Sequence, residues 1–238
     1  MLDMSWRTLL WVIIAGVLVG LGLFVYLNTR PTIGRSTHLI EWLRAPQAHP
    51  DWALQAGVRC GTAPFLMPTD GFVAYLWDDI FSGGHHHQGI DIFGGQGVDE
   101  TPVVAAYPGY LTRLPGWKSA VIERIPSDPL EPGRQIWLYY THMADPAGNS
   151  FVSDKFPPGT TERSIDAGTL LGYQGDYTGD PNSPTGVHLH FSVVKDNGRG
   201  GFLNELDIQN TYDPSPYLGL LLNADTSSGQ VVMCGVEN

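Results

Sequence analysis

Charged side chains are scarce in this chain, and basic ones are scarcer than acidic ones. Only 16% of the 238 residues are charged, with 13 Lys and Arg against 24 Asp and Glu. The imbalance grows after Ala45, where 9 basic residues face 22 acidic ones. Such a charge disfavours nucleic acid as a partner and disfavours tight adhesion to anionic lipid. An acidic surface that keeps a folded domain soluble is enough to explain it.

The chain also lacks long amphipathic helical patterns after residue 60, which argues against an all-α domain. Glycine and proline are abundant instead, at 29 and 18 residues, and they separate short segments typical of strands. We predict an all-β domain, an antiparallel β-sandwich or flattened barrel, preceded by one N-terminal transmembrane helix. The expected strands are residues 72–76, 89–93, 102–106, 110–114, 120–125, 135–142 and 186–194.

Cysteine is nearly absent, with only Cys60 and Cys234, which bracket the residues after the linker. Because the ends of a domain often lie close together, a disulfide between them is plausible. It would close a long loop and would indicate an oxidising compartment. The alternative is two unrelated buried thiols.

One long hydrophobic run is present, the 19 uncharged residues Leu9–Leu27. At about 1.5 Å per residue it can cross a hydrocarbon core of roughly 30 Å. It is long for a signal peptide and no small-residue cleavage site follows it, while a buried core helix would normally show a polar face. We therefore predict three parts: a transmembrane signal anchor (1–29), a juxtamembrane linker with short helices at 37–44 and 50–56 (30–59), and the β-domain (60–238).

The orientation of this anchor is a conflict within the sequence. Arg7 precedes the run, whereas Arg30, Arg35 and Arg44 follow it. The positive-inside tendency would place the β-domain in the cytoplasm. The cysteine pair, and the substrate inferred below, favour a single-pass protein of the cytoplasmic membrane with its β-domain on the extracytoplasmic side.

Four histidines and one aspartate fall in three short clusters. These are His87-Gln88-Gly89-Ile90-Asp91, Tyr140-Thr141-His142 and His188-Leu189-His190-Phe191. Residues two apart in a strand point to one face, so His188 and His190 project together, and His87 shares parity with Asp91 if its segment is extended. A catalytic zinc takes three protein ligands, for which two histidines and a carboxylate suit, and hydrolysis also needs a base and an oxyanion donor. No H-E-x-x-H motif is present to supply these, but two leftover histidines, His142 and His188, can.

These clusters resemble the motifs of the lysostaphin-type (LytM-domain) zinc metallopeptidases, which are H-x-G-x-D, Y-x-H and H-x-H before an aromatic residue. Residues 97–109 and 168–190 also resemble family segments, and the resemblance extends over about Pro68 to Leu218. It implies that His87, Asp91 and His190 hold one Zn²⁺ per chain and that His142 and His188 are the catalytic pair. It further implies an endopeptidase acting on peptidoglycan cross-links or stem peptides.

Some features depart from the family pattern. His85 and His86 offer a competing ligand register, although only His87 is in frame with Gly89 and Asp91. The loop at 126–133 is lengthened, and the loop at 144–163 is long enough to cover or narrow a groove. Tyr139, Tyr140 and Tyr177 are candidates for lining that groove, with packing as the alternative.

The sequence therefore predicts a membrane-anchored zinc endopeptidase. One rival is a non-hydrolytic envelope module that binds peptidoglycan or activates another hydrolase. A second rival is a protease with a different peptide or ester substrate. A purely structural zinc site is disfavoured because it normally uses four protein ligands.

Overall fold

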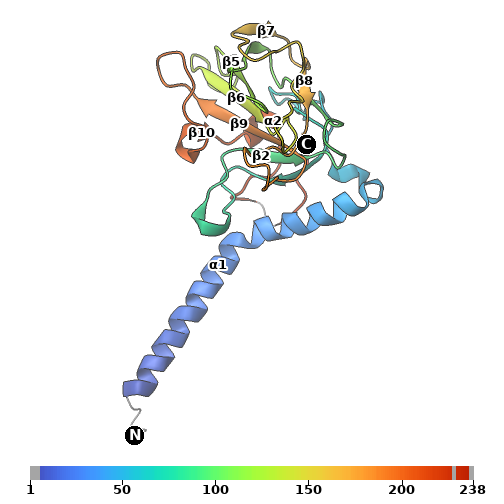
Figure 1. The fold of residues 1–238 in the computed structure, drawn as a ribbon. Coiled ribbons are helices and arrows are strands. Elements are labelled where there is room, and N and C mark those ends of the chain that lie inside the picture. Colours follow the sequence, from blue (N-terminus) through green and yellow to red (C-terminus); the bar gives the residue numbers. More distant parts are fainter. Residues whose placement is uncertain (1–5, 227–228, 236–238) are drawn as a thin grey trace.

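A single helix, α1 (Trp6–Arg44), leads into the β-domain. The computed structural model describes residues 6–226 and 229–235, without the side chains of residues 27–33 and Ser82. The first part of α1 projects from the domain, and the helix then bends so that its second part runs along the domain (Figure 1). Pro31 lies within the helix, where a proline removes one backbone hydrogen bond and commonly causes a bend.

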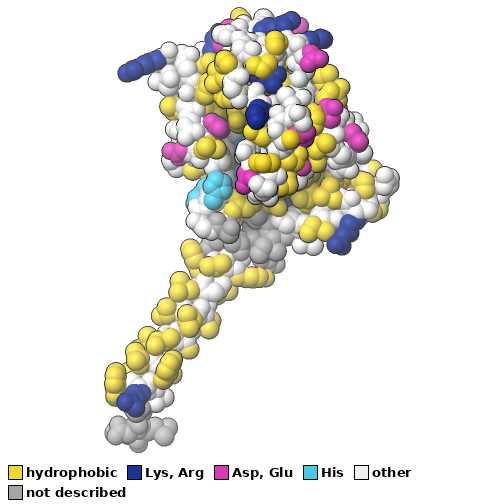
Figure 2. Space-filling view, in the orientation of Figure 1, with side chains coloured by type: hydrophobic (Ala, Val, Ile, Leu, Met, Phe, Trp, Pro, Cys, Tyr) yellow, Lys and Arg dark blue, Asp and Glu magenta, His cyan; other side chains and the backbone are white. Residues whose placement is uncertain are grey.

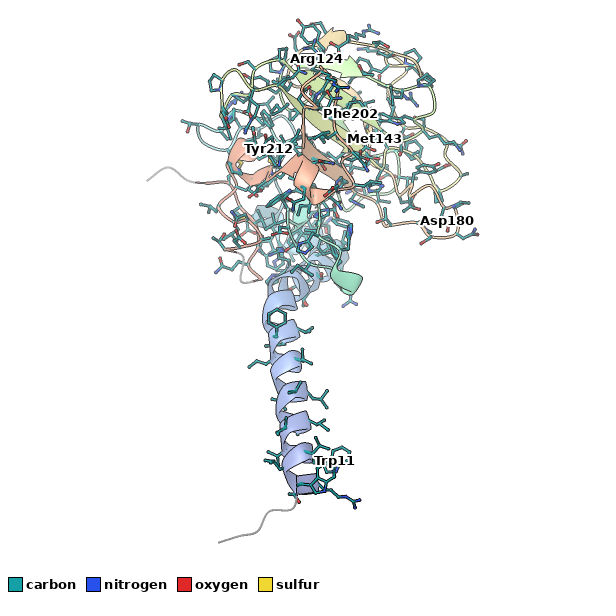
Figure 3. All side chains as sticks on the ribbon, turned by 90° about the vertical axis from the view of Figure 1, so that its left-hand side faces the viewer. Trp11, Arg124, Met143, Asp180, Phe202 and Tyr212 are labelled. Carbon is teal, nitrogen blue, oxygen red and sulfur yellow. A yellow bond between two sulfur atoms is a disulfide. The ribbon has the colours of Figure 1, made fainter. Side chains whose placement is uncertain are left out.

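The projecting part of α1 is apolar on all sides. Figure 2 shows it covered with hydrophobic side chains, and Figure 3 shows Trp11 near its far end. Among the described residues, Trp6–Tyr26 is the one segment long and apolar enough to cross a membrane, and it is not buried against the domain. A signal sequence near the N-terminus meets the same description.

The second part of α1 is docked on the domain rather than free. Leu39 and Trp42 are buried in a cluster with Phe72 and Ala74 of β1 (Phe72–Tyr75). The Trp42 and Phe72 rings stack at 6.0 Å. The predicted separate helix at 37–44 is thus part of α1, and the predicted helix at 50–56 is only a 3₁₀ turn, Pro50–Trp52. Apolar side chains at helical spacing in residues 37–44 pack on the outer face of β1, and this packing stabilises the second part of α1.

The main sheet is antiparallel, and its strand order is β1-β2-β9-β6-β5-β4-β7, with β10 also paired to β9. Beyond β1, its strands are β2 (Ile90–Phe93), β4 (Gly109–Thr112), β5 (Val121–Ile125), β6 (Ile136–Thr141), β7 (Arg163–Ile165), β9 (Leu189–Lys195) and β10 (Thr211–Tyr212). Seven strands were predicted within a few residues, counting β3 below.

A second, two-stranded sheet pairs β3 (Pro102–Val104) with β8 (Leu170–Tyr173). The core holds side chains from alternate positions of the central strands, such as Leu189, Phe191 and Val193 of β9. Within the described residues the main sheet ends at β1 and β7 and does not close on itself. The antiparallel all-β prediction is confirmed, in its flattened-sandwich form. The remaining helices are α2 (Ser215–Leu218) and the 3₁₀ turns Pro46–Ala48, Ser82–Gly84 and Ile208–Asn210.

The two cysteines are joined, as predicted. Cys60 and Cys234 form a disulfide, with their Cα atoms 5.0 Å apart and 174 residues apart in the chain. Residues 6–226 and 229–235 contain no other cysteine. The bond ties the entry of the β-domain to its last described segment.

A buried acid supports the strand that leads to the Y-x-H motif. Tyr140 of β6 receives a hydrogen bond from the Ala106 amide at 2.9 Å and donates one to Glu123 Oε2 at 2.9 Å. Both side chains are fully buried. Glu123 Oε1 has no hydrogen-bond partner among the described residues. Burial raises the pKa of Glu123 to about 8, against the opposing effect of the Tyr140 hydrogen bond.

Candidate metal centre and active site

The strand register places three site residues in one row across the main sheet. Asp91 of β2 lies opposite His190 of β9, and His190 lies opposite Thr141 of β6. Because side chains alternate along a strand, these residues share the face turned away from Leu189 and Phe191. His188 directly precedes β9, and His142 directly follows β6. Hence the ends of three neighbouring strands bring the predicted clusters together.

Three donor atoms converge at one point. His87 Nε2 lies 3.1 Å from Asp91 Oδ1 and 3.1 Å from His190 Nδ1, and His190 Nδ1 lies 2.8 Å from Asp91 Oδ1. This is the group of His, Asp and Cys ligand atoms that the described residues offer for a metal ion. The predicted ligand residues His87, Asp91 and His190 are therefore adjacent.

The outer nitrogens of these imidazoles are held by the protein. His87 Nδ1 lies 3.0 Å from the Leu76 carbonyl oxygen, which can only accept, so Nδ1 carries a proton and, in the neutral ring, Nε2 presents a lone pair. His190 Nε2 lies 2.8 Å from Ser192 Oγ, which can accept its proton and leave Nδ1 as a ligand. Such partners orient metal-binding histidines.

This donor set fits a zinc ion. A lone pair on His87 Nε2 faces a carboxylate oxygen at 3.1 Å, and two acceptors at that distance require a proton or a cation between them. Two imidazoles and one carboxylate within 4.8 Å of one another match the three protein ligands of a catalytic zinc site.

His142 and His188 lie beside the donor set, and each is held by the backbone through its Nδ1 atom. His142 Nδ1 donates to the Tyr177 carbonyl at 2.6 Å, and His188 Nδ1 donates to the Gly186 carbonyl at 2.8 Å. Their ring centroids are 4.5 Å apart. His188 Nε2 lies 3.5 Å from Asp91 Oδ1, and Phe93 stacks on the His188 ring at 4.8 Å. The backbone therefore holds both Nδ1 atoms, while His188 Nε2 faces Asp91 and both rings line the groove.

The electrostatics favour an ionised Asp91 beside neutral His142 and His190. Burial would raise the pKa of Asp91, but the neighbouring His87 and His188 outweigh it and hold that pKa well below its ordinary value. Burial lowers the pKa of His190, and burial together with His188 and His190 lowers the pKa of His142 to about 3. At His87 burial is outweighed by Asp91, and the pKa is raised.

His142 adopts an unusual backbone conformation. Its φ is 72°, in the left-handed region that non-glycine residues rarely occupy. The chain thus turns sharply at the end of β6 and aims the imidazole at His188. Outliers of this kind cost free energy and persist where the surroundings hold them.

The site opens into a groove with a volume of about 460 Å³. Tyr139, Tyr177 and Thr178 line it, as do Phe81, Ser119 and Glu205. Figure 3 shows Asp180 at the outer edge of the domain, in the segment that follows Tyr177 and Thr178. Tyr139 and Tyr177 were predicted groove residues, whereas Tyr140 lies in the core.

The long loop at 144–163 does not cover the groove, which corrects the expectation. None of its residues lines the groove. Val152 is paired with Gly172, and Phe156 is buried in the core. The loop is instead held down by its own apolar side chains, and the segment 177–185 borders the site.

Solved structures, but no family model and no curated protein, match this chain. Lysostaphin from Staphylococcus simulans is 19% identical with a TM-score of 0.40, over 62% of this chain and 49% of that chain. Its catalytic domain alone is 22% identical with a TM-score of 0.38, over 62% and 88%. A variant catalytic domain of the prophage-encoded M23 protein EnpA from Enterococcus faecalis is 20% identical with a TM-score of 0.37, over 63% and 95%.

The chain is similar to lysostaphin-type peptidases. It spans about half the length of lysostaphin itself. Because the identities are at most 22% and the TM-scores at most 0.40, these similarities support no conclusion about activity.

The lysostaphin-type motifs locate the candidate ligand side chains but not the groups that orient them. Of the three consecutive histidines, His87 reaches the donor set, His85 lines the groove, and His86 pairs with Asp78 at 2.5 Å. Ser192 was missed, although its position two residues after His190 places it on the same strand face. The Leu76 carbonyl carried no sequence signal, because a backbone oxygen has none.

Proposed function

We propose that this protein is a membrane-anchored, zinc-dependent endopeptidase that hydrolyses peptide bonds in peptidoglycan cross-links or stem peptides. The observation that carries the proposal is the convergence of His87, Asp91 and His190 beside two further histidines whose Nε2 atoms face a groove. A structural metal site would leave those two histidines without a role.

His87, Asp91 and His190 would hold the metal. Zinc bound there would polarise the scissile carbonyl and lower the pKa of water towards ~7. The Leu76 carbonyl and Ser192 would keep the two imidazoles in the ligand tautomer.

His142 and His188 would handle the protons. Each Nδ1–H is fixed on a carbonyl, so each ring in its neutral form would offer Nε2 as an acceptor for a proton from the attacking water. The imidazolium formed in this way could then steady the developing negative charge or protonate the leaving amine.

The substrate assignment is supported by the motif resemblance and by the open groove. Among the described residues, none of those lining the groove is a lysine or arginine, so a neutral or amine-bearing peptide would meet no fixed positive side chain from them. The division into an anchor (1–29), a juxtamembrane segment (30–59) and a catalytic domain (60–238) belongs to the same proposal. The disulfide supports an oxidising, extracytoplasmic compartment for the domain.

The decisive experiment is digestion of purified sacculi by the full chain in detergent micelles with zinc. Released fragments are read by mass spectrometry, together with labelling of new amino termini. We expect new amino termini that vanish with a chelator, return with added zinc, and are lost in His142→Ala and His188→Ala. His49→Ala is the matched control, because His49 stacks on Trp52 outside the groove and should leave release unchanged.

A folded, zinc-loaded chain that releases nothing would refute hydrolysis of peptidoglycan. Cleavage of proteins under the same conditions would then indicate a different peptide substrate, and binding of sacculi without cleavage would indicate a non-hydrolytic module. The location of the domain has its own test, which compares thiol labelling in intact cells before and after reduction. Cys60 and Cys234 that are found as free thiols before reduction would contradict the extracytoplasmic assignment.

A further inference from the structure

A buried arginine of helix α1 reaches into the β-domain. Arg35 is fully buried, and its guanidinium contacts both carboxylate oxygens of Asp79. Its Nε also donates to the Ala74 carbonyl oxygen at 3.0 Å. Asp79 is 3% exposed, so both charges are taken out of water together. A buried pair of this kind costs desolvation and is weak support for stability by itself.

Asp79, the partner of Arg35, binds Leu76, the residue whose carbonyl orients the His87 ring. Asp79 Oδ2 accepts a hydrogen bond from the Leu76 amide at 2.7 Å, and the Asp79 carbonyl accepts one from the His87 amide at 3.0 Å. The Leu76 carbonyl in turn accepts the proton of His87 Nδ1 at 3.0 Å. Asp79 therefore links the helix to the turn 76–79, which fixes both the backbone and the ring of His87.

This turn needs external support. Asp78, which lies between Leu76 and Asp79 in this turn, has a φ of 70°, a left-handed conformation that non-glycine residues rarely adopt. Such a backbone conformation persists only where contacts with the surrounding residues fix it. Without Arg35, the buried Asp79 carboxylate would lose its compensating charge and the turn 76–79 would be free to relax.

We propose that Arg35 is a positioning residue for the metal ligand His87, so that docking of helix α1 sets the metal affinity of the site. The inference rests on the proposed metal centre, and it assigns a role to a segment outside the lysostaphin-type motifs. It predicts that the membrane-proximal helix is an integral part of the catalytic unit.

The test is zinc affinity, measured by competition with a chromophoric chelator on the full chain in detergent, without reference to cleavage. We expect Arg35→Gln to weaken zinc binding by about 10-fold or more, because it would release the turn that carries the Leu76 carbonyl, the outer partner of His87. The Co²⁺ absorption spectrum of the substituted site should change with it. Arg134→Gln is the matched control. It breaks another Arg–Asp pair, with Asp128, at the end of β6 away from His142, and should leave affinity within about twofold.

Arg35→Lys covers the case in which Arg35→Gln does not fold. Lysine keeps the charge but lacks the planar fork that reaches Asp79 and Ala74 together, so affinity should again fall, by about 3-fold or more. A folded Arg35→Gln or Arg35→Lys chain with unchanged affinity and spectrum overturns the proposal. Unaltered chain that binds zinc but cleaves nothing refutes the proposed function alone. Unaltered chain that binds no zinc refutes both.

Discussion

Substitution of Glu123 gives a prediction whose size follows from the structure. The acid is fully buried between β4 and β6, with one oxygen on the Tyr140 hydroxyl and the other without a partner among the described residues. Burial raises its pKa from an ordinary 4.5 to about 8. Glu123→Gln keeps the acceptor for Tyr140 and removes the ionisation.

The sign and magnitude come from proton linkage. The folded state holds the Glu123 proton more tightly than the unfolded state, so ionisation costs stability as pH rises from about 4.5 to about 8. Each pH unit within this window is worth about 1.4 kcal/mol. Between pH 5 and pH 8 the free energy of unfolding should therefore fall by about 3 kcal/mol in the unaltered chain relative to Glu123→Gln.

The assay is denaturant unfolding of both chains in detergent, with chelator present and the disulfide intact, followed by tryptophan fluorescence. The histidines titrate in the same range, but they are common to both chains and cancel in the difference. Any cost of the glutamine amide is independent of pH and shifts the difference by a constant. A difference that stays flat from pH 5 to pH 8 would refute the assignment of a buried, protonated Glu123.

Three further predictions concern the site and its frame. Gly89→Ala should cost about 1–3 kcal/mol of stability in denaturant unfolding and weaken zinc binding, because a Cβ there would lie 2.3 Å from the Phe191 carbonyl oxygen. His142→Ala and His142→Gly should both abolish sacculus cleavage, but the glycine variant should be the more stable by about 1 kcal/mol, since φ is 72° at this position. Replacing Cys60 and Cys234 together by serine should lower the free energy of unfolding by about 5 kcal/mol in the chain-entropy model, given their separation of 174 residues.

Each of these has a control or a contradicting result. Gly116→Ala is the matched glycine control, because a Cβ there would meet nothing within 4 Å. Equal stability of the two His142 variants would contradict backbone strain at that residue. A loss below about 1 kcal/mol in the double serine variant would show that the unfolded chain is not restrained as the entropy account requires.

The sequence predicted the strands well where an alternation of apolar and polar residues is bounded by glycine or proline. Residues 136–141 and 189–195 form the centre of the sheet. In the first of them Ile136, Leu138 and Tyr140 face the main core, and the residues between them face a second hydrophobic cluster or the groove. The edge strand β7 and the short β10 were missed, since three or two residues carry too little periodicity. Helix docking was also missed, because β1 is buried on both faces and its partner is 30 residues away in the chain.

The candidate site was predictable to the level of side chains in motifs. The motifs identify His87, Asp91, His142, His188 and His190, and the structure brings all five together, while their roles remain predictions. What the sequence could not give is the backbone that orients them. The carbonyls of Leu76, Tyr177 and Gly186 are defined by folding alone.

The continuous but bent helix from Trp6 to Arg44 has a geometric consequence for the proposed anchored enzyme. A flexible tether would let a catalytic groove explore a volume around its attachment point. Here no irregular backbone separates the apolar stretch from the part docked on β1 (Figure 1). With the apolar stretch in a bilayer, the helix would hold the groove at a fixed distance from the membrane surface and in a fixed orientation relative to it. Cutting would then be confined to a thin layer parallel to the membrane, at a depth set by the protein's own dimensions.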